Sequence, residues 1–126
     1  MSGNLVDTNV IVKLLNGNAE AEKLFDSLGE VYLSVITVGE LIYGAQKSTR
    51  KEENIKLFGN FISEYPIISI NPDISRTYGK IKAELVSNGI NIPENDLWIA
   101  ATAVINDYRL ITYDKHFSSI SRLRLL

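Results

Sequence analysis

Short runs of consecutive apolar residues alternate along the chain with segments in which apolar residues recur at helical spacing. The apolar runs predict buried strands at residues 4–6, 31–36, 67–70 and 109–112. The periodic segments predict helices at residues 9–15, 19–28, 50–64 and 72–87. Residues 91–107 are apolar almost all round and predict a further helix, buried on most sides. This alternation indicates an α/β fold with a mostly parallel sheet covered on both faces.

The helix predicted over residues 72–87 has the clearest signals at its ends and along its length. Pro72 suits the first turn of a helix, and Asn88 followed by Gly89 is typical of the end of one. One stripe of this helix is apolar and comprises Ile74, Tyr78, Ile81 and Leu85. We therefore expect that stripe to face the core.

Composition narrows the class of protein. The chain has 126 residues, of which 45% are apolar, so we expect one domain over residues 1–126 with a sizeable core. No apolar run reaches the roughly 18 residues of a membrane span, and the N-terminus lacks a signal-peptide pattern. These features predict a cytoplasmic protein with no membrane partner. With no cysteine and a single histidine, His116, a metal site would need oxygen ligands.

Acidic side chains recur at corresponding places next to predicted strands. Asp7 lies directly after the first strand, where a charge inside the apolar run would otherwise be costly. Asp114 follows the strand at 109–112, and Glu40 opens the helix after the strand at 31–36. Asp96 stands at the entrance of the buried helix. Carboxyl ends of parallel strands meet at one edge of a sheet, so all of these acids can point to the same place.

Several of these acids also have a purely local explanation. Thr37 and Glu40 fit the spacing of a capping box, and Ile36 with Leu41 fits a hydrophobic staple. Asp96 suits the first turn of a helix, for which Asn95 is a plausible N-cap. An Asx turn or the cap of a short helical turn would explain Asp114.

Convergence of the acids predicts chemistry that the local explanations do not. Carboxylates that converge repel one another and raise one another's pKa unless a cation neutralises them. Oxygen-only ligands favour Mg²⁺ or Mn²⁺, and carboxylate-bound Mg²⁺ is suited to phosphate chemistry. The expected reaction is hydrolysis of a phosphodiester bond. The net charge of −2 lacks the basic character of many nucleic-acid binders, but a bound metal would reverse the field locally.

Four motifs together resemble the PIN-domain ribonucleases, and among them the VapC-like toxins of toxin-antitoxin pairs. The motifs, which occur in the family's order over nearly the whole chain, are VDTNVIV, ITVGELIYG with its E-x-x-x-G spacing, NDLWIAATA, and LITYDKHF with its T-x-D-x-x-F spacing. The resemblance implies a three-layer α/β/α sandwich and endoribonuclease activity that depends on Mg²⁺ or Mn²⁺. It also implies a homodimer and a cognate antitoxin protein that blocks the acidic pocket.

The resemblance also implies roles for individual residues. Asp7, Glu40, Asp96 and Asp114 would form the acidic quartet that holds metal and performs catalysis, with Asp7 and Asp96 as direct ligands. The supporting residues that would fix these carboxylates by hydrogen bonds are Asn9, Asn95 and Thr112. Some members of the family carry a further acid near the last motif, where this sequence has Lys115 and His116. The resemblance therefore does not decide whether the site would hold one metal ion or two.

Other functions are compatible with parts of the pattern. A receiver-like binding module would usually have paired acids after its first strand, whereas Thr8 and Asn9 follow Asp7. A catalytically silent PIN-like module that binds a partner is the other alternative. An isolated histidine such as His116 is more often structural than catalytic. Basic groups that could contact RNA phosphates, or could simply be solvated, are Lys47, Arg50 and Lys51, and Arg76, Lys80 and Lys82.

Overall fold

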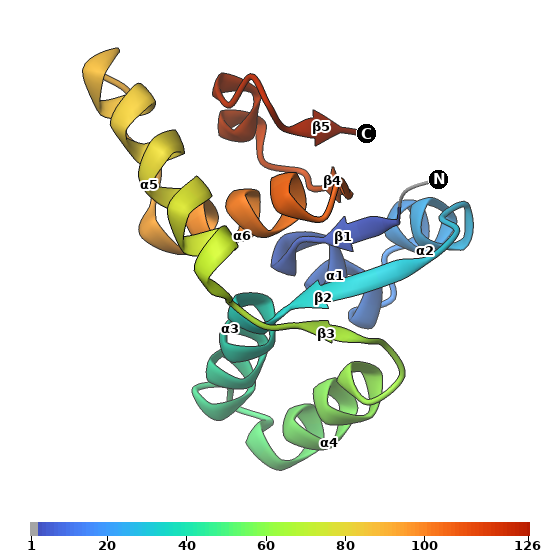
Figure 1. Cartoon of the computed structure of the whole chain (residues 1–126). Helices are drawn as coiled ribbons and strands as arrows, with labels where there is room; N and C mark the ends of the chain where they lie inside the picture. Colours follow the sequence, from blue (N-terminus) through green and yellow to red (C-terminus); the bar gives the residue numbers. More distant parts are fainter. Residues whose placement is uncertain (1–2) are drawn as a thin grey trace.

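A parallel sheet forms the centre of the molecule, which is described for residues 3–126 by a computed structural model (Figure 1). The strands are β1 (Asn4–Val6), β2 (Val31–Ser34), β3 (Ile67–Ile68), β4 (Arg109–Ile111) and β5 (Arg124–Leu125). Their order in the sheet is β3-β2-β1-β4-β5, and every neighbouring pair is parallel. The α/β fold with a parallel sheet is therefore confirmed, with β5 as an additional edge strand that the sequence pattern did not predict.

Helices cover both faces of the sheet and complete the three layers (Figure 1). They are α1 (Thr8–Leu15), α2 (Ala19–Asp26), α3 (Val35–Gln46), α4 (Lys51–Ile62), α5 (Pro72–Ser87), α6 (Glu94–Ile105) and the 3₁₀ helix η1 (Lys115–Ser119). Successive strand residues point to opposite faces. Leu5 and Leu110 accordingly join the core under α5 and α6, whereas Val6 and Ile111 join the core under α1, α3 and α4.

The helix predicted at 72–87 forms with those bounds because its local signals agree. The Asn71 side chain accepts a hydrogen bond from the Ile74 backbone N–H at 2.9 Å, and Pro72 occupies the first turn. Gly89 ends the segment with a φ of 72°, a left-handed conformation that glycine adopts without strain. Ile74, Ile81 and Leu85 are buried as predicted.

Helix α3 begins earlier than predicted, and this changes the interpretation of its first turn. Strand β2 ends at Ser34, whose hydroxyl accepts a hydrogen bond from the Thr37 N–H at 2.9 Å and caps the helix. Thr37 is therefore inside the helix, so the capping box of Thr37 with Glu40 and its associated staple are wrong. The β-branched Val35 and Ile36 imitate a strand, but the Ser34 cap decides the boundary.

Helix α6 also starts differently from the prediction. Its N-cap is Pro93, which makes no side-chain hydrogen bond, and Glu94 is its first residue. Asn95 is thus not the N-cap, and its amide is free to contact another element. The strand predicted at 67–70 is confined to Ile67–Ile68, and the strand at 109–112 ends at Ile111.

The amino edge of the sheet is held by aromatic stacking and by polar contacts. Tyr32 and Tyr108 stack with ring centroids 4.4 Å apart and an interplanar angle of 8°, and Gly3 lies against both rings. Asn4 donates to the Glu30 carbonyl at 2.9 Å and accepts from Arg109 Nε at 3.1 Å. This edge therefore has its polar groups paired without converging charges.

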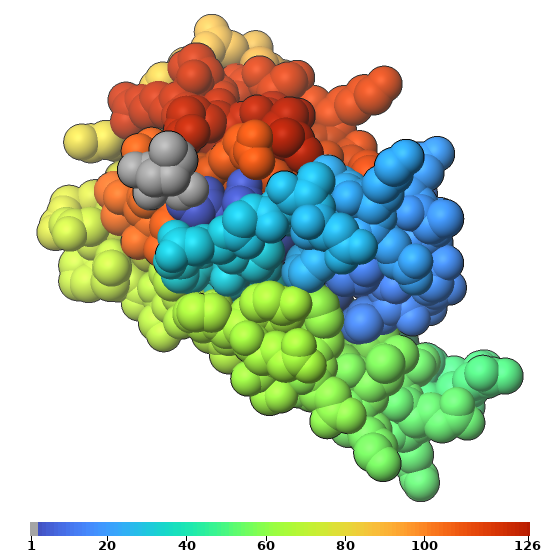
Figure 2. Space-filling view, turned by 90° about the vertical axis from the view of Figure 1, so that its right-hand side faces the viewer, coloured from blue at the N-terminus to red at the C-terminus, as the bar shows by residue number. Residues whose placement is uncertain are grey.

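The space-filling view shows one face of the molecule (Figure 2). Figure 2 shows α2, in light blue, between the C-terminal segment and α4, which projects at the lower right. Over residues 3–126, no helix combines the length and apolar character needed to cross a membrane.

Candidate active site

Asp7 lies directly after the central strand β1 and caps α1. Its Oδ1 accepts from the Thr8 N–H at 2.8 Å, and its Oδ2 accepts from the Thr112 hydroxyl at 2.8 Å. The side chain is buried, with the residue only 4% exposed. Burial is the main cause that raises the pKa of Asp7 to about 6, and the nearby Asp96 and Glu40 add to it. The carboxylate thus ends the strand as predicted but is more deeply enclosed than a side chain in an open crevice.

Glu40 reaches the same edge from the second turn of α3. Its Oε1 accepts from the Thr8 hydroxyl at 2.5 Å, and its Oε2 accepts from the Asn95 amide at 3.2 Å. Thr8 therefore links Glu40 to Asp7, since its N–H and its hydroxyl donate to the two acids. Asn95 links Glu40 to α6, which is the contact expected of a residue that supports the acids.

Asp96 and Asp114 meet around the imidazole of His116. Nε2 of His116 is 2.8 Å from Asp96 Oδ2, and Nδ1 is 2.8 Å from Asp114 Oδ1. Two ionised carboxylates are both satisfied only when both ring nitrogens carry hydrogen. Burial is the largest cause that raises the pKa of Asp96, with Glu40 and Asp114 adding to the shift and His116 opposing it. Asp114 also caps η1, accepting from the His116 N–H at 3.5 Å, as its local explanation predicted.

Thr112 and Asn9 connect the first and last acids of the chain. The Thr112 hydroxyl donates to Asp7 and accepts from the Asp114 N–H at 3.0 Å. Asn9 donates to that hydroxyl at 3.4 Å and accepts from the Tyr113 N–H at 3.2 Å. These contacts fix the segment after β4 against the start of α1, and with it the position of Asp114.

The predicted quartet therefore gathers at the carboxyl edge, but its members are not equally close. Among the described residues, Asp96, Asp114 and His116 form a group whose potential ligand atoms all lie within 4.8 Å of one another. Asp7 and Glu40 stand outside this group and are joined to it through electrostatic interaction and through Thr112 and Asn95. The oxygen-rich donor set fits a divalent cation, and the imidazole would add a nitrogen donor only through a ring nitrogen that carries no hydrogen.

His116 is the member of the site that the sequence pattern did not predict. An isolated histidine carries no spacing signal of its own. The available clue was that Asp114 caps the turn containing His116, which places the two side chains side by side. Its contact with Asp96 depends on the packing of α6 and could not be predicted locally.

Three of the six basic residues considered for RNA contact are in ion pairs with acids outside the quartet. Arg50 pairs with Glu53 at 3.9 Å, Arg76 pairs with Asp73 at 2.9 Å, and Lys82 pairs with Glu94 at 2.7 Å. Each of these pairs is exposed and contributes little to stability. They leave the carboxyl edge without a lysine or arginine bridge to the acids among the described residues.

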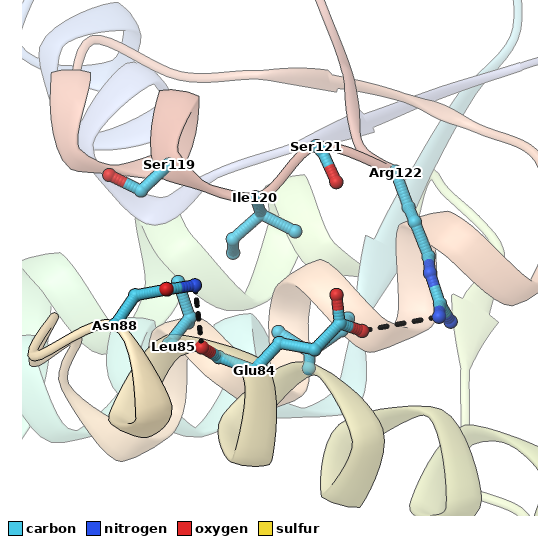
Figure 3. Close-up of a pocket in the computed structure, with 8 residues that line it drawn as sticks. Glu84, Leu85, Asn88, Ser119, Ile120, Ser121 and Arg122 are labelled. Atoms are coloured by element: carbon cyan, nitrogen blue, oxygen red, sulfur yellow. Dashed lines mark hydrogen bonds and ion pairs between the residues drawn. The ribbon is translucent and has the colours of Figure 1, made fainter.

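A separate pocket of about 210 Å³ lies between the end of α5 and residues 119–122 (Figure 3). Several of its polar groups already interact within the protein, since Arg122 pairs with Glu84 at 3.1 Å and the Asn88 amide donates to the Glu84 carbonyl at 3.0 Å. It contains none of the quartet acids. A shallower hollow of about 350 Å³ lies beside Glu40 and Asn95, and this one adjoins the candidate site.

Comparison with known proteins decides the family. A family model described as PIN domain matches residues 5–123. The chain belongs to the PIN-domain family. This PIN domain is 35% identical to "Ribonuclease VapC2" of Haemophilus influenzae over 95% of this chain and 93% of that protein. It is 29% identical to the "tRNA(fMet)-specific endonuclease VapC" of Shigella flexneri, over 95% of this chain and 93% of that one.

Solved structures agree with the assignment. The PIN domain superposes on a chain of the Rickettsia felis VapBC2 complex, bound to a DNA fragment from its promoter, with a TM-score of 0.90 and 30% identity. The alignment covers 98% of this chain and 96% of that one. The predicted resemblance to VapC-like PIN domains is therefore confirmed.

Proposed function

We propose that this PIN domain is an endoribonuclease that hydrolyses RNA phosphodiester bonds and acts as the toxin of a toxin-antitoxin pair. The observation that carries the proposal is the convergence of Asp7, Glu40, Asp96 and Asp114 at one edge of the sheet. The strand order places this edge where the chain reverses direction across the sheet, between β1 and β4. Ligands of open parallel sheets bind at such a point. The ribonuclease names of the relatives support the same activity.

Asp96, Asp114 and Asp7, with Glu40 beside them, are the residues that would hold Mg²⁺ or Mn²⁺. Asp96 and Asp114 present oxygens within 4.8 Å of each other, and the enclosed Asp7 adds charge that favours a cation. A bound divalent ion would supply an activated water and stabilise charge on the leaving oxygen. His116 contacts both Asp96 and Asp114, so the carboxylate oxygens open to a divalent ion depend on whether the imidazole keeps these contacts when the ion binds.

The remaining residues of the site orient the acids. Thr8 and Thr112 donate to Asp7, so its carboxylate is fixed in one orientation. Thr8 and Asn95 do the same for Glu40. Fixed carboxylates lose little freedom when a cation or a substrate phosphate arrives, which is the purpose of such supporting contacts in metal sites.

The partners follow from the same proposal. We expect RNA as the substrate, a cognate antitoxin protein that covers the acidic edge, and a homodimer. The crystal structure of the Rickettsia felis relative is of a VapBC2 complex, which supports an antitoxin as partner. A cytoplasmic location and a single domain over residues 1–126 remain predictions.

The decisive experiment is cleavage of a structured RNA by the purified protein with Mg²⁺ or Mn²⁺, with EDTA as a parallel condition. Asp7→Asn should lower the cleavage rate at least about 100-fold, because even residues that only support metal ligands contribute 10- to 100-fold. Asp26→Asn, an exposed aspartate at the end of α2, is the matched control and should cut normally.

Two results would contradict the proposal. Cleavage that persists in EDTA or in Asp7→Asn would show that another site or a contaminant cuts the RNA. No cleavage with either ion, together with no divalent-ion binding by calorimetry, would favour the alternative of a catalytically silent partner-binding module.

A further inference from the structure

We propose that two tyrosine-lysine pairs, Tyr43 with Lys47 and Tyr113 with Lys13, hold a single-stranded segment of RNA on either side of the acidic site. The tyrosine rings would stack on bases, and the lysines would contact the neighbouring phosphates. The proposal rests on the proposed ribonuclease function and adds the substrate class and the residues that position it.

The first pair lies on α3, close to Glu40. Tyr43 is one turn beyond Glu40 and is 65% exposed, so its ring is accessible to a ligand. Its ring forms part of the hollow of about 350 Å³ that also contains Glu40, Asn95 and the exposed Val35. Lys47 holds its ammonium 4.9 Å from the ring centroid. An apolar ring and a cation therefore stand together next to a quartet acid.

The second pair repeats this combination with residues from different elements. Tyr113 lies between Thr112 and Asp114, and its N–H donates to Asn9 at 3.2 Å. Its side chain is exposed, and the Lys13 ammonium from the last turn of α1 lies 5.0 Å from its ring centroid. This contact joins two elements far apart in the sequence, so helical spacing alone does not account for it.

The sheet order places the pairs on opposite sides of Asp7. Tyr43 belongs to the helix after β2, and Tyr113 belongs to the segment after β4. Strand β1, which ends at Asp7, lies between β2 and β4. A strand of RNA that crosses the acidic edge from one pair to the other would thus pass over the quartet.

Within residues 3–126, Lys13 and Lys47 have no carboxylate partner in a salt bridge, a property that they share with other lysines such as Lys51 and Lys80. They differ from those lysines because each lies over a tyrosine ring close to a residue of the acidic site. Their positive charge is available to phosphates at an edge that otherwise repels RNA. This answers how a protein with a net charge of −2 could draw a polyanion to its acids.

Stacking of bases on the tyrosine rings would favour single-stranded RNA over duplex RNA. Aromatic side chains stack on bases of any kind, but only when the bases are unstacked and accessible. Bases inside a duplex are not accessible, and sequence-dependent RNA recognition is concentrated in loops and single-stranded segments. We therefore expect the enzyme to cut loops or single strands in preference to paired stems.

The test measures RNA binding separately from cleavage. Fluorescence anisotropy is recorded with a labelled single-stranded RNA of mixed sequence and with the corresponding duplex, all in an Asp96→Asn background that prevents cutting. The variants are Tyr43→Ala, Tyr43→Phe, Lys47→Gln, Tyr113→Ala and Lys13→Gln. Lys23→Gln and Lys56→Gln on α2 and α4 are matched controls, and thermal unfolding by circular dichroism verifies that each variant folds.

Removal of either ring should weaken binding of the single strand about 5- to 100-fold, and binding of the duplex should not change. Tyr43→Phe keeps the ring and should bind within about 2-fold of its parent, since stacking does not need the hydroxyl. Each Lys→Gln change at the pairs should reduce the slope of log affinity against log salt by about 0.7, while the control lysines leave it unchanged.

The inference is overturned if folded Tyr43→Ala and Tyr113→Ala bind single strands like the parent, or if they weaken the duplex equally. Cleavage by the otherwise unmodified protein distinguishes this failure from failure of the proposed function. If the unmodified protein cuts RNA normally and the variants bind RNA like the parent, only the proposed role of the tyrosine-lysine pairs is wrong. Absence of both cleavage and RNA binding would remove the ribonuclease proposal and this inference together.

Discussion

The carboxyl edge and the amino edge of the sheet differ in how their polar groups are satisfied. At the amino edge, Tyr32 stacks on Tyr108, and the Asn4 amide contacts a carbonyl and Arg109. At the carboxyl edge, like charges converge, and burial raises the pKa of both Asp7 and Asp96. The amino edge is thus arranged for stability, whereas the carboxyl edge keeps an arrangement that is unfavourable unless it binds something positive.

Among the acids of the carboxyl edge, Asp7 should have the largest effect on the free energy of unfolding. Its pKa rises from 3.8 to about 6 in the folded protein, so the folded state holds this proton more tightly than the unfolded chain. Stability from this group is complete below pH 3.8 and is lost as pH rises through about 6. The shift corresponds to a difference of up to about 3 kcal/mol in the free energy of unfolding.

Asp7→Asn should remove this pH dependence. We expect the variant to be more stable than the parent well above pH 6 and to lose this advantage in acid, when both are compared in EDTA. Urea unfolding at a series of pH values measures the difference, and Asp26→Asn should show no such trend. A variant that is less stable than the parent at high pH would contradict the view that the acidic edge carries a cost in stability.

Gly3→Ala tests the amino edge by a change that leaves the acids untouched. A β-carbon at residue 3 would collide with the Tyr32 ring and come within 3.4 Å of the Tyr108 ring. Overpacking of this kind costs about 1–3 kcal/mol in the free energy of unfolding. Denaturant unfolding measures the loss, and RNA cleavage per folded molecule should stay unchanged.

Gly29→Ala is the matched control for that substitution, because a β-carbon there meets nothing within 4 Å. Equal stability of the two variants would mean that the stacked Tyr32 and Tyr108 rings can shift at little cost to make room for the added β-carbon. Reduced cleavage by folded Gly3→Ala would show that the two edges are coupled.

Thr112→Val sharpens the comparison at the acidic edge itself. The change removes the donor to Asp7 and the acceptor for the Asp114 N–H, while it nearly preserves side-chain shape. We expect cleavage to fall about 10-fold, as is usual when the partner of a metal ligand is lost. Thr112→Ser retains the hydroxyl and should recover most of the rate in the same assay. If the serine variant is as slow as the valine variant, the hydroxyl and its hydrogen bonds do not by themselves account for the rate, and the methyl group is needed as well.

Lys82→Gln should have the smallest effect. The Lys82 to Glu94 pair joins α5 to the start of α6, but its side chains are 45% and 56% exposed. Solvent screening makes such an exposed pair contribute little to stability, and Tyr78 keeps its hydrogen bond to Glu94. Thermal unfolding measures the change. A larger loss, or a loss of cleavage, would mean that this pair positions Asp96 through the first turn of α6.

The sequence by itself determined the class of fold, because that depends on local periodicity. Apolar runs predicted β1 and β4 to within a residue, and the stripe and end signals of 72–87 predicted α5 with its observed bounds. The order of acids after strands also predicted their shared edge, since carboxyl ends of parallel strands necessarily lie together. Where two local signals competed, as at Ser34 and Thr37, the pattern chose the wrong cap.

Only the tertiary structure decided which side chains touch. The contact of His116 with Asp96, the link of Asn95 to Glu40 and the position of Lys13 over Tyr113 join elements whose separation in the sequence carries no periodic signal. The deep burial that raises the pKa of Asp7 likewise arises only when the chain packs into its folded form. Local propensity determines the strands and helices. The distances between their side chains are set only when the other strands assemble on either side of β1.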